Sequence, residues 1–318
     1  MTELYEGLRR LSEPLFDPGH RIYWPFLVGS LLIAGFAAAI KGRRRLVGLL
    51  SPELWLHRSA RVDYQLWLVK HGAKLAGLLV LPLSTLTVAR WTVRSLSNHF
   101  DLVSAPNWPS WLISALFTGA LFVCWDLSRY LLHRLMHSIP SLWSLHQVHH
   151  SAEVLTPMTF YRTHPLESLL YQLRGVLVAG VLTGVFFWLF QTRAQAWQLL
   201  GVSGVGFAFN LLGGNLRHSH VWLSYGRVEK WLLSPAQHQL HHAEGCVHNY
   251  GAWLALWDRI GGSLMLAGTE RQLTFGLPEQ DRNHQPDSLW SILWRPVLDA
   301  LRLLNPLRTT ASADTRAQ

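Results

Sequence analysis

The chain is poor in cysteine and in charge. Only Cys124 and Cys246 occur among 318 residues, and charged side chains make up 15% of the total. Two cysteines cannot build a disulfide framework or the four-cysteine site of a ferredoxin cluster. The Gly-x-Gly-x-x-Gly fingerprint of a dinucleotide-binding domain and a haem attachment motif are absent as well. Redox chemistry in this chain would therefore depend on electrons from a separate protein.

Acidic residues are scarcer than basic ones, which leaves a net charge of +9. An excess of this size is also found in nucleic-acid-binding proteins. Here the clearest basic run, residues 41–45, directly follows an apolar segment. That position is typical of a cytoplasmic flank of a membrane span, so we expect no nucleic-acid partner.

Apolar residues reach 49% of the composition and gather in five segments. About 20 apolar residues in a helix span the hydrocarbon core of a bilayer. The candidate spans are residues 22–40, 73–89, 111–125 (continuing as a helix to 137), 175–190 and 196–213. The short sequence QTRAQ at 191–195 would join the last two as a helical hairpin. The sequence predicts an all-α, polytopic integral membrane protein, the alternative being a soluble protein with buried core helices.

Three regions follow from this pattern. Residues 1–110 form an N-terminal membrane region with two hydrophobic segments and no cleavable signal peptide. Residues 111–268 carry the histidines, and residues 269–318 hold an amphipathic helix at 285–304, interrupted by Pro296, and a disordered tail at 309–318. If residues 41–45 are cytoplasmic, counting the spans places every histidine cluster on the cytoplasmic side, as a helical metal-binding cap.

Histidine is the unusual abundance, with 17 residues in all, 12 of them between His133 and His248. His133 and His137 are four apart, a spacing that puts both on one helix face. Two boxes with matching letters, HQVHH and HQLHH, follow. They contain His146, His149 and His150, and then His238, His241 and His242. SPAQ at 234–237 reads as a capping box with proline at the first helical position, so the second box should open a helix.

These eight imidazoles suffice for two metal ions, and neutral imidazole suits iron, zinc, copper or nickel. Further candidate ligands are His218, His220, His164 and His248, with His164 alternatively orienting a ligand. The Glu-x-x-His spacing of ferritin-like di-iron sites is absent. Asp126, two helical turns before His133, is either a hydrogen-bond partner for an imidazole N–H or a simple pair with Arg129.

The chain resembles the fatty acid hydroxylase and sterol desaturase superfamily. The resemblance covers about residues 119–264 and rests on DLSRYLLHRLMH, SLWSLHQVHHS and SPAQHQLHHAEGCVHNYGAWLALWDRIGG. RTHPLE and NLRHSH are similar to the bacterial branch. Many members carry a histidine pair between the last two boxes, and here only His218 and His220 could supply it.

The resemblance implies a metal-dependent oxygenase that hydroxylates or desaturates a lipid C–H bond with O2 and two electrons. It implies two iron ions, with zinc as the alternative. They would be held by the pair His133 and His137 and the six histidines of the two boxes (together the eight box histidines), with His218 and His220. Asp126 and His164 are the expected catalytic auxiliaries. A reductase, ferredoxin or cytochrome would donate the electrons, and a bacterial inner membrane is the expected location. The lipid and the oligomeric state are left open.

Three other functions fit parts of the pattern. A membrane metal transporter would hold its site near the bilayer midplane on broken helices, whereas the histidines here follow the apolar segments. A membrane cytochrome would need only two axial histidines for each haem. A zinc-dependent membrane hydrolase would use the same boxes, with Glu153 or Glu244 as the general base.

Overall fold

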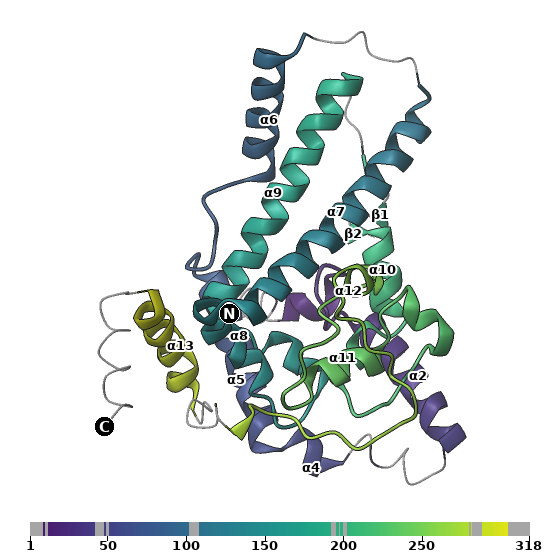
Figure 1. Cartoon of the computed structure of the whole chain (residues 1–318), viewed down its shortest axis with the longest axis vertical. Helices are drawn as coiled ribbons and strands as arrows, with labels where there is room; N and C mark the ends of the chain where they lie inside the picture. The colour runs from purple at the N-terminus through teal and green to yellow at the C-terminus, as the bar shows by residue number, and fades with distance from the viewer. Residues whose placement is uncertain are drawn as a thin grey trace.

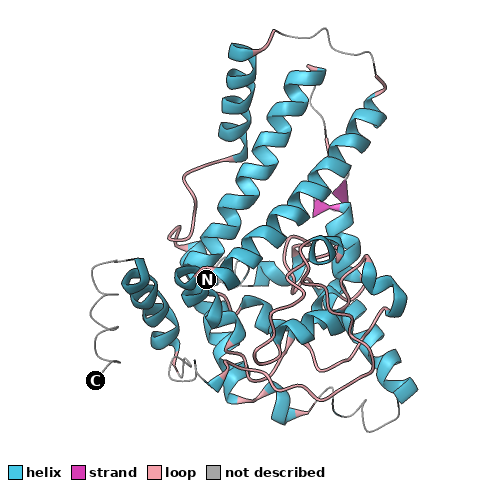
Figure 2. Ribbon diagram, in the orientation of Figure 1, coloured by secondary structure: helices cyan, strands magenta, loops and turns pink. Residues whose placement is uncertain are grey.

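The computed structural model describes residues 9, 12–41, 48, 51–101, 108–191, 195–196, 198–199, 202–279, 281 and 288–304. The regular secondary structure of these residues is helical apart from two short strands, and loops join the elements (Figure 2). The long helices are α2 (Trp24–Lys41), α5 (Arg58–Leu75), α6 (Thr85–His99), α7 (Ser110–Ser138), α8 (Pro140–His150), α9 (Pro165–Phe190) and α13 (Leu289–Leu304). The short ones are α4 (Pro52–Trp55), η1 (Pro157–Tyr161), α10 (Gly204–Leu211), η2 (Gly214–His218), η3 (Gly226–Lys230), α11 (Pro235–His242) and α12 (Leu256–Ile260).

Helices α7 and α9 are long and apolar enough to cross a bilayer. The 29 residues of α7 extend about 43 Å, against roughly 30 Å for a hydrocarbon core. Only 22% and 17% of their apolar windows are buried, which favours membrane helices over core helices of a soluble protein. With α6 they project from the rest of the described chain (Figure 1). The predicted all-α membrane architecture is confirmed, including the continuation of the 111–125 segment to residue 137.

Helix α6 packs closely along α9 because α9 has glycine at the contact. A methyl group on Gly180 would lie 2.5 Å from Cβ of Val88, and one on Gly184 would lie 2.6 Å from Cβ of Thr92. Both distances are far below a van der Waals contact. Small residues of this kind allow membrane helix backbones to approach each other.

Replacing Gly180 by alanine is expected to lower the free energy of unfolding by about 1–3 kcal/mol, the usual cost of overpacking. The matched control is Gly119→Ala in α7, where an added methyl group meets no atom within 4 Å. It should leave stability unchanged or raise it slightly. The check is the thermal midpoint of both variants in the same detergent; equal midpoints would contradict the close contact.

Two of the predicted spans are wrong. Helix α5 ends at Leu75 and α6 begins at Thr85, so residues 73–89 are not one helix. Of residues 196–213, the described part forms strands β1 (Gln198–Leu199) and β2 (Val202–Ser203), paired antiparallel, and then the eight-residue α10. The predicted helical hairpin around QTRAQ is therefore absent from the described residues. High apolar content permitted a helix in both places, but neither continues long enough to cross a membrane.

The histidine-bearing part of the fold lies where α7 ends and α9 begins (Figure 1). Helix α8 follows α7 after a single residue, Ile139, and η1 leads into α9. A buried ion pair holds α5 against this segment: Arg162 lies 2.9 Å from Asp63 and also donates to the carbonyl of Val148 and to Ser151. This network fixes the C-terminal end of α8, where two of the box histidines lie.

The C-terminal amphipathic helix is present as α13, with Pro296 inside it as predicted. It packs on α8 and leaves Trp290, Trp294 and Leu301 exposed. The predicted tail at 309–318 and most of the basic run at 41–45 lie outside the described residues. The division at residues 110 and 268 remains a prediction.

Candidate metal centre

The boxes lie on the helices that the sequence predicts. HQVHH forms the C-terminal half of α8, and HQLHH forms most of α11. The predicted capping box is confirmed: the Ser234 hydroxyl accepts from the Gln237 N–H, and the Gln237 side chain accepts from the Ser234 N–H. This cap lets α11 begin three residues before its first histidine.

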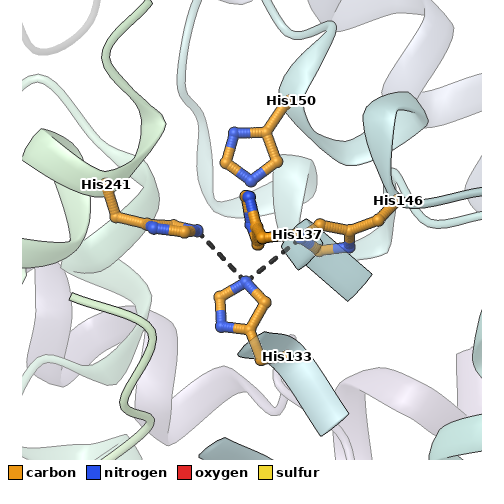
Figure 3. Close-up of side chains that lie close together, drawn as sticks. All are labelled: His133, His137, His146, His150 and His241. Atoms are coloured by element: carbon orange, nitrogen blue, oxygen red, sulfur yellow. Dashed lines mark hydrogen bonds between the residues drawn. The ribbon is translucent and has the colours of Figure 1, made fainter. Parts of the chain in front are cut away.

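Nine histidines converge in two adjacent groups, and within each group the ligand atoms lie within 4.8 Å of one another. Group A consists of His133, His137, His146, His150 and His241 (Figure 3). Group B consists of His149, His218, His238 and His242. The groups touch: the rings of His150 and His242 stack with centroids 4.7 Å apart. All eight box histidines are therefore brought together, joined by His218.

Each box serves both groups. HQVHH places His146 and His150, which are four residues apart, in group A and His149 in group B. HQLHH does the reverse: His238 and His242 belong to group B, and His241 belongs to group A. Successive helical residues are rotated by about 100°, so adjacent histidines point to different centres. This division explains why a histidine pair ends each box.

Several imidazoles are held through Nδ1. His133 donates from Nδ1 to the Tyr250 carbonyl at 2.7 Å, and His241 donates to the His248 carbonyl at 2.8 Å. In group B, His149 donates to the Arg162 carbonyl at 3.1 Å. A carbonyl can only accept, so each of these rings carries its proton on Nδ1 and, when neutral, presents a bare Nε2 to the centre.

The imidazole nitrogens suit a metal ion as ligands, and several of them cannot hydrogen bond to one another. Nε2 of His133 lies 3.1 Å from Nε2 of both His146 and His241 (Figure 3). Where both nitrogens are bare, they cannot hydrogen bond to each other. Nε2 of His137 and of His150 is buried with no hydrogen-bond partner. Converging, unprotonated imidazole nitrogens are the ligand set of a transition-metal ion, and a cation between them removes the conflict.

Burial keeps the imidazoles neutral. It lowers the pKa of His149 and of His241 to about 3. It also lowers the pKa of His150, His218 and His242 well below the ordinary value. Neutral rings are required for metal binding, so at neutral pH these five histidines can act as ligands without first losing a proton.

These pKa shifts predict acid sensitivity. In the unfolded chain the same histidines bind protons below about pH 6.5, whereas in the folded chain His149 and His241 stay neutral to about pH 3. Burial also holds the pKa of the other three well below the ordinary value. The unfolded state therefore gains more protons as pH falls, and stability drops between pH 6.5 and 3. We expect the thermal midpoint to fall steadily from pH 7 to pH 5, with or without added metal. A midpoint independent of pH would show that the rings are not buried as neutral groups.

Glu167 is the partner that the sequence reasoning overlooked. Its carboxylate accepts from Nδ1 of His146 at 2.9 Å, and both side chains are buried. It lies in the RTHPLE motif, which was its only signal, because it lacks the Glu-x-x-His spacing. His164 in the same motif does not reach the histidine groups. It caps α9, accepting from the Leu166 N–H and donating to the Leu293 carbonyl, and so fixes the turn that carries Glu167.

The imidazole contact predicted for Asp126 is wrong, as is its pairing with Arg129. The Asp126 carboxylate accepts from the N–H groups of residues 253 and 254 and from the Trp257 indole. It anchors the loop whose Tyr250 carbonyl holds a group A ring. The Asp126 carboxylate contacts this loop and not an imidazole. The contact joins residues 127 or more positions apart, which no local pattern reveals.

His220 and His248 also lie outside both groups. The His220 ring packs against Phe275, with centroids 6.4 Å apart. The NLRHSH motif thus gives one ligand candidate, His218 in η2, and its second histidine follows the helix end and points elsewhere. His248 takes part through its carbonyl, as the acceptor for His241.

A cavity of about 300 Å³ opens beside the two groups. It reaches His133 and His146 of group A and His149, His218 and His238 of group B. Its charged lining consists of Arg21, Arg129, Arg217, Lys70 and Glu167. A separate, almost wholly apolar cavity of about 520 Å³ lies against α2 and shares no lining residue with the first.

Comparison with known proteins identifies the histidine-bearing region. The fatty acid hydroxylase family model matches residues 118–263, which contain both histidine groups. These residues belong to the fatty acid hydroxylase and sterol desaturase superfamily. The predicted resemblance is thereby confirmed. No solved structure matches the chain.

The curated proteins that this chain is similar to include lipid-modifying enzymes. Human alkylglycerol monooxygenase is 27% identical over 62% of this chain and 42% of its own length. An ornithine lipid hydroxylase of Rhizobium tropici is 28% identical over 62% of this chain and 54% of its own length. A delta(7)-sterol 5(6)-desaturase of Aspergillus fumigatus is 30% identical over 59% and 60%. The chain thus spans about half the length of the curated relatives it matches.

Proposed function

We propose that the chain is a membrane-bound oxidoreductase that hydroxylates or desaturates a lipid C–H bond. In hydroxylation, one atom of O2 enters the C–H bond and the other leaves as water, with two electrons and two protons supplied from outside. In desaturation, both oxygen atoms leave as water and two hydrogens leave the lipid. The observation that carries the proposal is the pair of histidine groups beside a cavity, in a region whose relatives are lipid hydroxylases, monooxygenases and desaturases.

Group A and group B would each hold one metal ion, which we propose to be iron, with zinc as the alternative. Two iron ions would supply O2 activation at the cavity wall, whereas two zinc ions would not. Among the described residues, group A offers five imidazoles and group B offers four. The carbonyl and carboxylate partners on Nδ1 keep the rings oriented and raise their basicity toward a metal.

The protein's own contribution is orientation and enclosure. The Tyr250 and Arg162 carbonyls orient one ring in each group. The capped N-terminus of α11 positions the histidines of HQLHH. Cavity residues from α7, α9 and η2 confine the lipid beside the histidines. Holding one carbon in place near the reactive centre accounts for much of the rate acceleration in reactions of this kind.

We further propose a multi-pass protein of a bacterial inner membrane with its metal site facing the cytoplasm. In support, both histidine groups gather at the end of the α7–α9 pair where α7 ends and α9 begins. A separate reductase, ferredoxin or cytochrome would supply the electrons, since the sequence carries no redox cofactor motif. The zinc hydrolase is less well supported: its candidate base Glu153 is paired with Arg58 on the surface.

The test is a lipid comparison under isotopically labelled O2. Membranes of cells that produce the chain are compared with membranes that contain a His242→Ala variant. We expect lipids with one labelled oxygen atom, or with one added double bond, only with the unaltered chain. A matching lipid profile in the two membranes, with a competent electron donor present, would overturn the proposed activity.

A further inference from the structure

The cavity beside the histidines has an excess of positive charge. Three arginines from distant segments line it: Arg21 before α2, Arg129 in α7 and Arg217 in η2. Lys70 lines it as well, and Glu167 is the single carboxylate among the described residues that line it. Cations inside a protein are normally paired, because a desolvated charge without a partner is costly. An excess of this kind therefore indicates a ligand that supplies negative charge.

The protein itself does not neutralise the three arginines. No described residue accepts a hydrogen bond from their guanidinium groups, and none forms an ion pair with them. The Arg21 and Arg129 guanidiniums lie over the rings of Phe160 and Tyr171. Arg217 is 7% exposed and borders the cavity. Aromatic faces stabilise a cation only weakly compared with a carboxylate or phosphate.

The other charged groups nearby are already engaged. Lys70 donates to Thr163 and to the Tyr161 carbonyl. Glu167 is bonded to His146, and Asp126, the other carboxylate that attracts Arg217, accepts three hydrogen bonds from the 253–257 loop. The contrast with Lys70 is informative, because among the described cations that line the cavity only the three arginines lack a hydrogen-bond acceptor.

We propose that Arg21, Arg129 and Arg217 bind an anionic headgroup, a phosphate or a carboxylate, of the lipid that is oxidised. Guanidinium groups suit both anions, because their paired N–H donors match two oxygens at once. The inference rests on the proposed function and names its substrate class. The same cavity borders both histidine groups and has room for about ten water-sized groups. The oxidised carbon therefore lies within a few bonds of the charged headgroup and far from the end of the acyl chain.

The test measures, by calorimetry, how tightly matched twelve-carbon probes bind to the full, metal-loaded chain in a nonionic detergent. The probes are dodecyl phosphate, dodecanoate and dodecanol, and inorganic phosphate is the comparison without a carbon chain. We expect one or both anionic amphiphiles to bind at least about tenfold more tightly than dodecanol, as expected for charge-assisted hydrogen bonds. The tighter of the two identifies the headgroup as phosphate or carboxylate. Equal binding of dodecanol would overturn the proposal, and inorganic phosphate binding as tightly as dodecyl phosphate would overturn its lipid part.

Arg129→Gln and Arg217→Gln are each expected to weaken binding of the preferred anion about tenfold and to leave dodecanol unchanged. Arg61→Gln, an exposed position on α5 away from the cavity, is the matched control and should bind as the unaltered chain does. Arg217→Lys keeps the charge and should retain part of the preference, which distinguishes lost anion binding from misfolding. Full anion preference in both glutamine variants would overturn the assignment.

Binding of these probes requires neither O2 nor electrons, so the two proposals can fail separately. If the anions bind as expected but no lipid is oxidised, the proposed function is wrong. If labelled oxygen enters a neutral lipid, the oxidoreductase stands and the anionic substrate class is wrong.

Discussion

His218→Ala is expected to remove one of the two metals and to reduce lipid oxidation to background. His218 is the one group B ligand candidate outside the boxes, and its Nε2 lies 3.1 Å from the Nε2 atoms of His238 and His242 and 3.3 Å from that of His149. Its loss leaves group B with three described imidazoles. The effect should exceed the roughly 100-fold upper limit seen when an outer hydrogen-bond partner of a ligand is removed. Product formation and metal content are measured on the same preparation.

The control lies two residues away in the same motif. His220 packs against Phe275 outside both groups, so His220→Ala should keep two metals and most of the activity. Sequence alone treats the two histidines as equivalent, whereas the structure separates them. Equal loss of metal in both variants, or retention of both metals in His218→Ala, would contradict the assignment of group B.

Glu167→Gln is expected to lower metal affinity at group A by about 10–100-fold. The amide keeps the size of the side chain and can still accept from Nδ1 of His146, but it lacks the negative charge that raises the basicity of the ring. In the structure this carboxylate is buried and 2.9 Å from Nδ1. During titration with a competing chelator, the variant should release one metal at a lower chelator concentration than the unaltered chain does. It should release the other metal at the same chelator concentration as the unaltered chain.

Glu153→Gln provides the comparison for this effect. Glu153 is paired with the exposed Arg58 and does not reach the histidine groups, so its variant should release both metals as the unaltered chain does. If Glu167→Gln behaves in the same way, the hydrogen bond to His146 has no influence on the metal, and the role given to Glu167 is wrong.

The sequence predicted the convergence of the box histidines because the signals are local. Spacings of three and four residues place side chains on neighbouring parts of a helix surface, and the SPAQ cap marks where α11 begins. It did not predict which centre each ring faces. That division depends on how α7, α8 and α11 are oriented against one another, which no single box encodes.

The remaining features depend on contacts between distant segments. The arginines of the cavity come from positions 21, 129 and 217, and none of them lies in a motif that marks an anion site. Asp126 meets a loop 127 residues later in the chain. The predicted spans at 73–89 and 196–213 failed for a different reason: hydropathy measures how apolar a segment is, and an apolar segment can also form a loop, a short strand or a short helix.

The most direct test of the two-metal centre is the metal content of the purified full chain, measured by elemental mass spectrometry after production in iron-supplemented cells. Two histidine groups built from nine imidazoles, eight of them buried, predict two irons per chain. Two zincs would keep the metal centre but contradict the proposed oxidation chemistry. Folded protein with no bound metal would contradict the metal-centre interpretation of groups A and B.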